Sequence, residues 1–290
     1  MLYHIINKKK MMETNYRKLS LRELQLMQLE AMKDIHRVCQ KRGIKYYIIA
    51  GTLLGSIRHG GFIPWDDDID IAMMREEYEK FRIIFLEEFD LNNYFLQHYE
   101  SDVDFRPELM RFCIKNTFSN NVAEMHWNNC KNTYIDIFPL DNVPDDKKLR
   151  KKQYVGIMHW KKLISLKLYR INSTDTFISL FVKKSLSFIL RLIPLRLAHK
   201  KQEELMKKYD FEVTECVCSM ASKYNFSKQC MNRRIYGKPT LVKFEDTEFY
   251  APEMPTKYLE HLYGVNYMDI PSVEKRAVPE EVYIVKKKSL

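Results

Sequence analysis

Lys45-Tyr-Tyr-Ile-Ile-Ala50 is a short apolar and aromatic run of the kind that forms a buried strand. It leads directly into Gly51-Thr-Leu-Leu-Gly-Ser-Ile-Arg58, where we expect a helix that Gly60-Gly61 breaks. Asp68-Ile-Asp-Ile-Ala72 follows, and its alternation of acidic and branched apolar residues predicts a second strand. These residues therefore predict a strand, a helix and a second strand that carries two acids.

Helices are predicted on both sides of this stretch. Ser20-Leu-Arg-Glu23 has the form of a capping box, which opens a helix, and Gly43 should end that helix. The charge-rich segment 75–88 is the helix expected after the second strand. The apolar residues that share one face of the first helix are Leu24, Met27, Ala31, Ile35 and Val38.

The remaining elements follow further along the chain. Thr133-Tyr-Ile-Asp-Ile-Phe138 predicts a third buried strand, which Pro139 should stop. Residues 147–209 have a helical and basic pattern. Residues 236–271 predict a few short strands and a final helix around 256–263.

The composition is that of a folded protein in a reducing compartment. Of the 290 residues 46% are hydrophobic, while only 8 are glycine and 10 proline, so general disorder is excluded. The six cysteines form no CxxC pair, and the N-terminal sequence lacks the apolar run of a secretory signal. We therefore expect a cytoplasmic protein.

Three acids on apolar strands are the candidate catalytic residues. Asp68 and Asp70 stand two residues apart, so on a strand their side chains point to the same face. Asp136 repeats the pattern on the third strand, between two isoleucines. Carboxylates in such surroundings need a positive partner, and hard oxygen ligands suit Mg²⁺ or Mn²⁺. The hypothesis is a metal site for phosphoryl transfer; the alternative is exposed turn or cap residues.

The turn between the first strand and its helix is a candidate phosphate site. Gly51 and Thr52 lie there, and glycine lets the backbone approach an anion that the helix N-terminus attracts. An ordinary turn is the alternative. Arg58, at the other end of the helix, is either a further phosphate ligand or a plain surface arginine.

The net charge of +10 is concentrated in one segment. Residues 147–208 hold 17 Lys and Arg against three acids, so the surplus there is +14 and the remainder sums to −4. This segment should face an anionic partner. A nucleic-acid-binding protein is one hypothesis, because aromatic residues are interleaved with the charges, but no recognisable nucleic-acid-binding motif accompanies them.

The run Ala50-Gly-Thr-Leu-Leu-Gly-Ser-Ile-Arg-His-Gly-Gly-Phe-Ile-Pro-Trp-Asp-Asp-Asp-Ile-Asp-Ile71 resembles the signature of the LicD family, which is related to fukutin and belongs to the nucleotidyltransferase-fold superfamily. Tyr134-Ile-Asp-Ile-Phe-Pro-Leu-Asp141 is similar to the second block of that family. Tyr263-Gly-Val-Asn-Tyr-Met-Asp-Ile-Pro271 is a weaker match. The strong resemblance covers about a third of the chain.

The resemblance implies an α+β fold with a nucleotidyltransferase-like mixed sheet flanked by helices, to which a basic helical region is added. We expect an N-terminal helical segment, a catalytic core, a basic and mainly helical region, and a C-terminal segment that packs back on the core. Their ranges are 1–45, 46–142, 143–235 and 236–290.

The resemblance also assigns roles to residues. Asp68, Asp70 and Asp136 match the acids of the family's active site, beside the Gly-Thr turn. The implied metal is Mg²⁺ or Mn²⁺, with Asp136 as a ligand or as the base for a hydroxyl proton. The other residues implied in substrate binding are Trp65, Arg111 and Lys115. Asp66 and Asp67 are expected either to bind metal or substrate or only to fix the turn into the strand. The segment Arg111–Thr117 departs from the family pattern at Cys113 and Ile114, which leaves its donor and acceptor contacts open.

The reaction implied is transfer of a phospho-alcohol, in the first place phosphocholine from CDP-choline, to a sugar hydroxyl of a cell-surface glycan. Lipopolysaccharide and teichoic acid are the expected acceptor types, lipid-linked or free. The rival enzyme is a nucleotidyltransferase that uses NTP, because three acids alone would serve either reaction. The transferred alcohol, the acceptor sugar and the oligomeric state stay open.

Residues 177–193 form a separate feature, an amphipathic helical pattern with three basic residues: Lys183, Lys184 and Arg191. These charges are too many for a comfortable transmembrane span. The helix is expected either to pack on the protein's own core or to lie on an anionic membrane surface. In the second case the enzyme would be peripheral at the inner face of the membrane.

Overall fold

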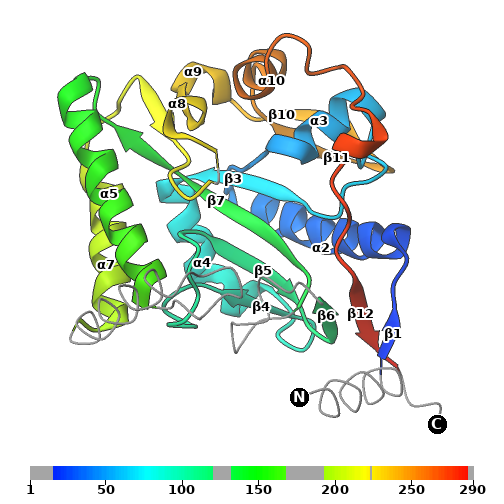
Figure 1. Ribbon diagram of the computed structural model, residues 1–290. Helices are drawn as coiled ribbons and strands as arrows, with labels where there is room; N and C mark the ends of the chain where they lie inside the picture. The colour runs from blue at the N-terminus through cyan, green and yellow to red at the C-terminus, as the bar shows by residue number, and fades with distance from the viewer. Residues whose placement is uncertain (1–15, 120–131, 168–192, 223, 287–290) are drawn as a thin grey trace.

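A mixed sheet with β3 and β7 at its centre organises the fold (Figure 1). The computed structural model describes residues 16–119, 132–167, 193–222 and 224–286. Within them the sheet has the order β2-β3-β7-β5-β4, and β8 and β9 extend it along the far end of β7. Among the strands in the described ranges, only β3 and β7 pair in parallel. The strands are β2 (Tyr47–Ile48), β3 (Asp70–Met74), β4 (Tyr94–Gln97), β5 (Met110–Ile114), β7 (Tyr134–Val143), β8 (Cys216–Cys218) and β9 (Cys230–Asn232).

Two smaller sheets flank the central one. In the first, β12 lies between β1 and β6, so the C-terminal part of the chain joins the N-terminal strand. In the second, β10 and β11 form an antiparallel hairpin. The strands are β1 (Tyr16–Lys18), β6 (Thr117–Ser119), β10 (Thr240–Phe244), β11 (Thr247–Ala251) and β12 (Val282–Val285).

Helices surround the sheet, and the α+β class expected from the sequence is confirmed. The main core runs between the central sheet, α2, α3, α4, α10 and the β10–β11 hairpin. The helices are α2 (Leu21–Arg42), α3 (Ala50–His59), α4 (Arg75–Glu88), α5 (Lys147–Lys167), α7 (Leu195–Met206), α8 (Phe226–Gln229), α9 (Arg233–Tyr236) and α10 (Pro255–Tyr263), with short 3₁₀ turns at η1 (Lys207–Tyr209) and η2 (Val273–Lys275).

The helix predictions around the first motif are confirmed. Ser20 and Glu23 form the capping box of α2, and Gly43 ends this helix in the left-handed conformation. The apolar face of α2 is buried, except that Met27 is half-buried. Helix α4 covers the predicted range 75–88, and α10 and the β10–β11 hairpin lie where short strands and a final helix were expected.

The two first strands are shorter than predicted. β2 keeps only Tyr47 and Ile48, because Ala50 already opens α3 and has a positive φ of 48°. β3 begins at Asp70 instead of Asp68, because its pairing with β7 starts with Asp70 opposite Asp136. Asp68 therefore lies on the segment that leads into the strand.

Pro139 does not stop β7, which contradicts the sequence prediction. The N–H of Asp136 donates to the carbonyl of Ile69, so alternate N–H groups of β7 point at β3 and the position of Pro139 faces the other side. On that side the pairing with β5 ends at Ile137, and the pairing with β8 starts at Asp141. A proline between two partners removes no ladder hydrogen bond.

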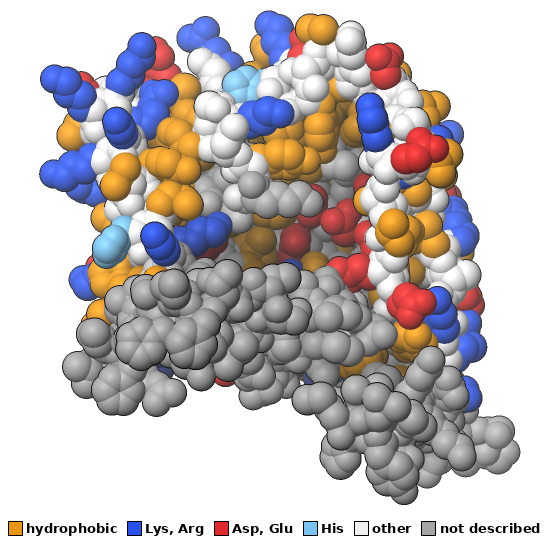
Figure 2. Space-filling view, viewed as in Figure 1, with side chains coloured by type: hydrophobic (Ala, Val, Ile, Leu, Met, Phe, Trp, Pro, Cys, Tyr) orange, Lys and Arg blue, Asp and Glu red, His pale blue; other side chains and the backbone are white. Residues whose placement is uncertain are grey.

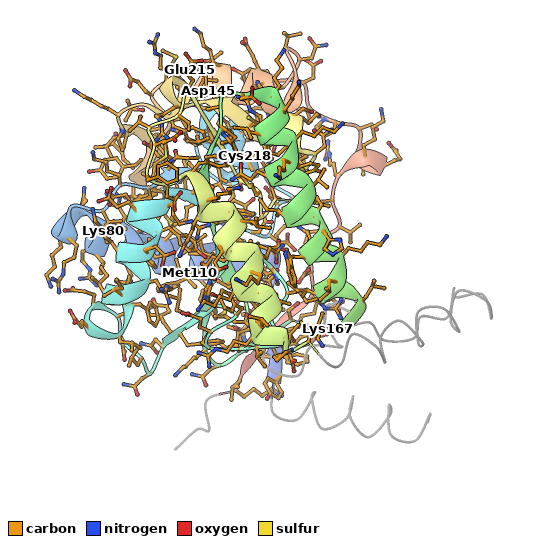
Figure 3. The ribbon with its side chains drawn as sticks, turned by 90° about the vertical axis from the view of Figure 1, so that its left-hand side faces the viewer. Lys80, Met110, Asp145, Lys167, Glu215 and Cys218 are labelled. Carbon is orange, nitrogen blue, oxygen red and sulfur yellow. The ribbon has the colours of Figure 1, made fainter. Side chains whose placement is uncertain are left out.

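The basic segment forms two helices that lie side by side, α5 and α7 (Figures 1 and 3). The helical prediction for 147–209 is confirmed at 147–167 and 195–206. Residues 168–192 are outside the described part of the chain, and so is nearly all of the amphipathic pattern at 177–193. Among the helices that are described, none combines the length and the apolar character that crossing a membrane requires.

Gly55 fixes how closely α3 approaches the following loop. A Cβ there would lie 2.4 Å from the backbone oxygen of Gly61 and 3.1 Å from the backbone nitrogen of Ile63. Gly55→Ala is therefore expected to lower the free energy of unfolding by about 1–3 kcal/mol in urea denaturation, because backbone atoms must shift. The matched control is Gly156→Ala in α5, where the added methyl meets only the mobile end of Leu205. Equal stability of both variants would contradict the close packing of α3.

Candidate active site

One cavity brings the three candidate acids together. It has a volume of about 200 Å³, and Asp68, Asp70 and Asp136 all line it. We call it the acid cavity. Figure 2 shows acidic side chains in a hollow of this face, with hydrophobic side chains beside them. Three carboxylates from two segments of the chain, separated by more than sixty residues, thus face one space.

Strand pairing explains why two of these acids are neighbours. Asp70 and Asp136 stand opposite each other in the parallel pairing of β3 with β7. The isoleucines next to them on both strands are fully buried, as predicted from the alternating pattern. The sheet core thereby holds both carboxylates at its surface, and Asp68 joins them from the segment that precedes β3.

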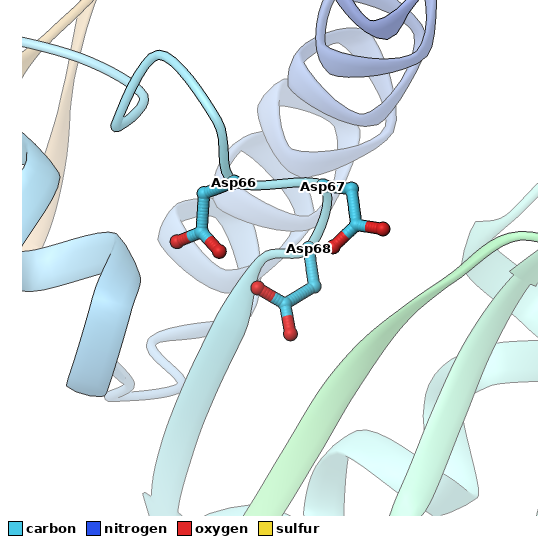
Figure 4. Close-up of side chains that lie close together, drawn as sticks. All are labelled: Asp66, Asp67 and Asp68. Atoms are coloured by element: carbon cyan, nitrogen blue, oxygen red, sulfur yellow. The ribbon is translucent and has the colours of Figure 1, made fainter. Parts of the chain in front are cut away.

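Two buried glutamines of α2 hold the acidic loop. Figure 4 shows the side chains of Asp66, Asp67 and Asp68 on the segment before β3. The amide of Gln25 donates to the carbonyl of Asp66 at 2.9 Å, and that of Gln28 donates to the carbonyl of Asp67 at 2.9 Å. The backbone N–H of Glu280 donates to the Asp67 carboxylate. These contacts leave the loop little freedom, so the acids are held in place before any ligand binds.

The start of α3 is strained and contacts the same cavity. Ala50 lines the cavity and has a left-handed φ, which a non-glycine residue rarely adopts. Its N–H donates to the Tyr258 hydroxyl at 3.3 Å. Burial raises the pKa of Tyr258 well above its ordinary value, the hydrogen bond from Ala50 lowers it in part, and the negative charge of Asp70 raises it again. Tyr258 is therefore a neutral anchor.

The Gly-Thr turn supports the acids directly. A Cβ on Gly51 would lie 2.7 Å from Asp66 Oδ2, so only glycine lets this carboxylate reach the start of α3. The Thr52 hydroxyl accepts a hydrogen bond from the backbone N–H of Asp70 at 2.8 Å. Both residues thus position acids, while their predicted contact with a phosphate stays a prediction.

Arg111 forms an ion pair with Asp136. Its Nε donates to Asp136 Oδ1 at 3.0 Å, and its guanidinium lies 3.6 Å from the centre of the Tyr134 ring. Arg111 is 6% exposed, and it stands opposite Asp136 in the pairing of β5 with β7. It therefore stabilises an ionised Asp136. The ion pair with Asp136 gives Arg111 a structural role, and its role in phosphate binding stays a prediction.

Three other predicted binding residues lie outside the acid cavity. Arg58 donates to the backbone carbonyls of Tyr267 and Asp269. Lys115 donates to the carbonyl of Leu91 and lines a separate groove next to β12.

Trp65 lies beside the acidic loop, and its indole ring is covered by Arg276, whose Cζ is 4.1 Å from the ring centre. The structure thus brings the acids together in the acid cavity, while Arg58, Trp65 and Lys115 lie outside this cavity. Their roles in substrate binding remain predictions.

One wall of the acid cavity was missed by the sequence analysis. Ser219, Ser222, Tyr224 and Gln229 line it from the segment between β8 and β9. No local pattern marks these residues, because β8 reaches the site only by pairing with β7. The weak signal that could have pointed to β8 is its alternating Cys216-Val-Cys218 sequence, which fits a short buried strand.

The donor set fits a hard divalent cation. The carboxylate oxygens that lie within 4.8 Å of one another belong to Asp66, Asp67 and Asp68. Of the three predicted metal ligands only Asp68 is in this group, and it shares the acid cavity with the other two, Asp70 and Asp136. Oxygen ligands at this density are what Mg²⁺ and Mn²⁺ prefer in proteins. The residues present therefore suit the predicted metal.

The part of the chain that carries the three acids is similar in sequence to a known domain family. Residues 43–168 match the sequence model of the LicD/FKTN/FKRP nucleotidyltransferase domain. This range contains the β2–α3–β3 unit, β7 and all three acids. Over this range, which is less than half of the 290 residues, the chain is similar to LicD-type domains.

Three relatives show how far the similarity extends. The chain is 25% identical to the lipopolysaccharide cholinephosphotransferase LicD of Haemophilus influenzae, in an alignment of 290 positions that covers 93% of this chain and 100% of that protein. It is 31% identical to an uncharacterized protein of Rickettsia prowazekii over 56% of this chain and 52% of that protein. It is 38% identical to human ribitol 5-phosphate transferase FKRP over 53 residues, which is 17% of this chain and 11% of that protein.

Proposed function

We propose that this protein is a metal-dependent phosphotransferase that moves a phospho-alcohol from a CDP-linked donor to a sugar hydroxyl of a cell-surface glycan. The observation that carries the proposal is the single cavity lined by Asp68, Asp70 and Asp136, within the range that matches the LicD family. The names of two relatives, a cholinephosphotransferase and a ribitol 5-phosphate transferase, support this reaction type. Phosphocholine is the first donor group to test, since the similarity to the cholinephosphotransferase extends over nearly the whole chain.

In the proposed reaction the acceptor oxygen attacks the phosphorus that bears the alcohol. A new P–O bond forms to the sugar, the bond to the bridging oxygen of the diphosphate breaks, and CMP leaves with that electron pair. The hydroxyl proton passes to a carboxylate of the site and then to solvent. Because Arg111 already bonds Asp136 Oδ1, we favour Asp136 as a ligand and treat proton acceptance as its second role.

The metal has a defined place in this proposal. Asp68, Asp70 and Asp136 would hold Mg²⁺ or Mn²⁺, which when bound neutralises charge on the donor diphosphate. The start of α3 lies at the same cavity, and a helix N-terminus favours an anionic phosphate oxygen. The protein itself therefore contributes orientation and charge rather than a covalent step.

Purified protein is expected to release CMP from one of three donors, CDP-choline, CDP-ribitol or CDP-glycerol, in the presence of a lipopolysaccharide or teichoic acid acceptor. EDTA should abolish this release, because a diphosphate and three carboxylates repel each other unless a cation screens them. Added Mg²⁺ or Mn²⁺ should restore it. Chromatographic separation of nucleotides measures the reaction.

Two outcomes would contradict the proposal. Release of pyrophosphate from an NTP, with no CMP from any CDP-alcohol, would establish the rival nucleotidyltransferase reaction. An undiminished rate after exhaustive chelation would exclude the metal-dependent mechanism.

A further inference from the structure

A second cavity opens next to the acid cavity. It has a volume of about 270 Å³ and shares Ser219, Ser222 and Tyr224 with the acid cavity. Tyr154 and Phe226 complete its aromatic lining, and we call it the aromatic cavity. A ligand long enough to fill both cavities would pass these shared residues.

The wall on α5 is suited to a flat ligand. Tyr154, Met158 and Lys161 stand four and three residues apart, so they share one face of the helix. The rings of Tyr154 and Phe226 have centroids 4.8 Å apart and are tilted by 40°. Both rings are half-buried, which leaves part of their surface for a ligand. The electron-rich face of an aromatic ring attracts the C–H groups on one side of a sugar ring.

Ser219 carries a hydroxyl group that lacks a partner. It is 2% exposed, and its Oγ has no hydrogen-bond partner among the described residues. Leaving a buried hydroxyl unpaired destabilises a protein by about 1–3 kcal/mol, so such a group needs an explanation. Because Ser219 lines both cavities, a ligand hydroxyl at their junction would satisfy it.

The charge around the aromatic cavity favours an anionic ligand. Helix α5 holds eight Lys and Arg and no acid. Lys161 is paired with Glu108 at 3.0 Å, while Lys151, Lys152 and Lys162 are exposed. Figure 2 shows Lys and Arg side chains along the same edge of the face, where Figure 1 places α5. A chain that leaves the cavity over α5 therefore meets positive charge.

The start of α3, where the proposed donor diphosphate would bind, and the aromatic cavity lie on different sides of the acid cavity. Ile49 and Ala50, at the start of α3, line the acid cavity on one side, whereas the β8–α8 segment lines it toward α5. Figure 1 shows α3 and α5 on opposite sides of β3 and β7. In-line displacement requires the acceptor and the leaving group on opposite sides of the phosphorus. A donor diphosphate at α3 thus leaves the α5 side for the acceptor.

We propose that the aromatic cavity is the acceptor subsite and binds a sugar ring of an anionic glycan. Tyr154 and Phe226 stack on the ring, Ser219 bonds one of its hydroxyls, and the attacking hydroxyl reaches the acid cavity. The assignment of this cavity to the acceptor of the transfer rests on the function proposed above, but glycan binding to the cavity can be measured independently of that function.

The test is titration calorimetry with the water-soluble phosphorylated oligosaccharide that mild acid releases from lipopolysaccharide. Tyr154→Ala is expected to weaken binding about tenfold, because a stacking face is lost. Ser219→Ala should weaken it about fivefold through one lost hydrogen bond. The matched control is Phe211→Ala, since Phe211 is an aromatic residue that is 79% exposed and lies outside the cavity; its affinity should equal that of the wild type.

The melting temperature distinguishes the subsite from a purely structural role of Ser219. If Ser219 serves the subsite, the Ser219→Ala variant should melt at the same temperature as the wild type or higher, since it removes an unpaired buried hydroxyl. In turnover assays both variants should raise KM for the glycan, whereas Phe211→Ala should leave this KM unchanged.

Unaltered oligosaccharide affinity in both variants, or no binding by the wild type, would overturn the subsite. A lower melting temperature for Ser219→Ala with unchanged affinity would assign that residue to the fold. Binding that depends on Tyr154 and Ser219 with no CMP release from any CDP-alcohol would keep the subsite and remove the proposed function.

Discussion

Asp70→Asn is expected to lower the rate of CMP release by about three orders of magnitude. A cation held by carboxylates stabilises a phosphoryl-transfer transition state by several kcal/mol, and about 4 kcal/mol corresponds to a thousandfold rate change. Asp68→Asn should have an effect of similar size, because both side chains line the acid cavity. The rate is measured at saturating CDP-choline and Mg²⁺.

The matched control is Asp246→Asn. Asp246 lies in the β10–β11 turn, and its side chain is 68% exposed. Its ion pair within the described residues is with Lys33. The activity of this variant should equal that of the wild type. Near-normal turnover in both cavity variants would exclude the metal-site assignment. Neither cavity variant should lose stability in metal-free buffer, since removing one of several neighbouring carboxylates reduces their mutual repulsion.

Asp136 differs from the other two acids in its contribution to stability. Asp136→Asn should abolish activity as well, but it also withdraws the charge that pairs with the buried Arg111. A decrease of about 1.5–3 kcal/mol in the free energy of unfolding is therefore expected, the range for a hydrogen bond to a charged group. The sequence alone predicts no stability difference among the three acids.

Asp141→Asn is expected to lower the free energy of unfolding by about 3–5 kcal/mol, the usual effect of breaking a buried ion pair from one side. Asp141 is fully buried and bonds Arg75 at both oxygens, with distances of 2.6 Å and 2.9 Å. Burial alone would lower the pKa of Arg75, but the charge and hydrogen bonds of Asp141 raise it above its ordinary value. The variant would leave this buried guanidinium with its longer ionic contacts, to Glu79 at 3.4 Å and to Glu203 at 3.5 Å.

Urea denaturation measures the effect, with Glu76→Gln as the matched control. Glu76 lies next to Arg75 in the first turn of α4 and pairs with Lys80, but its side chain is 79% exposed. Its replacement should therefore change the free energy of unfolding by less than about 1 kcal/mol. Equal stability of the two variants would show that the Arg75–Asp141 pair contributes nothing. Asp141 closes the second block of the LicD-like sequence, and this pair gives it a structural role that pins the start of α4 to β7.

Local signals in the sequence determined most helices and the position of the acids on the chain. The capping box at Ser20 and Glu23, the left-handed glycine at Gly43 and the helix over 75–88 all depend on residues a few positions apart. The alternation around Asp70 and Asp136 predicted correctly which side chains are buried. The first motif, with Gly51 and Thr52, placed the site at the start of α3.

Only the tertiary structure decided which distant groups complete the site. Pro139 stays inside β7 because its missing N–H falls between two partner strands, and that arrangement depends on where β5 ends and β8 begins. Arg111 becomes the partner of Asp136, and Ser219 and Tyr224 become a cavity wall, through strand register. Helical and strand patterns are encoded within about one turn or one pleat, whereas register between strands far apart in sequence is set by the packing of the whole core. For this reason the acids and the Gly-Thr turn could be recognised in the sequence, while the pairing of Arg111 with Asp136 and the wall from the β8–β9 segment could not.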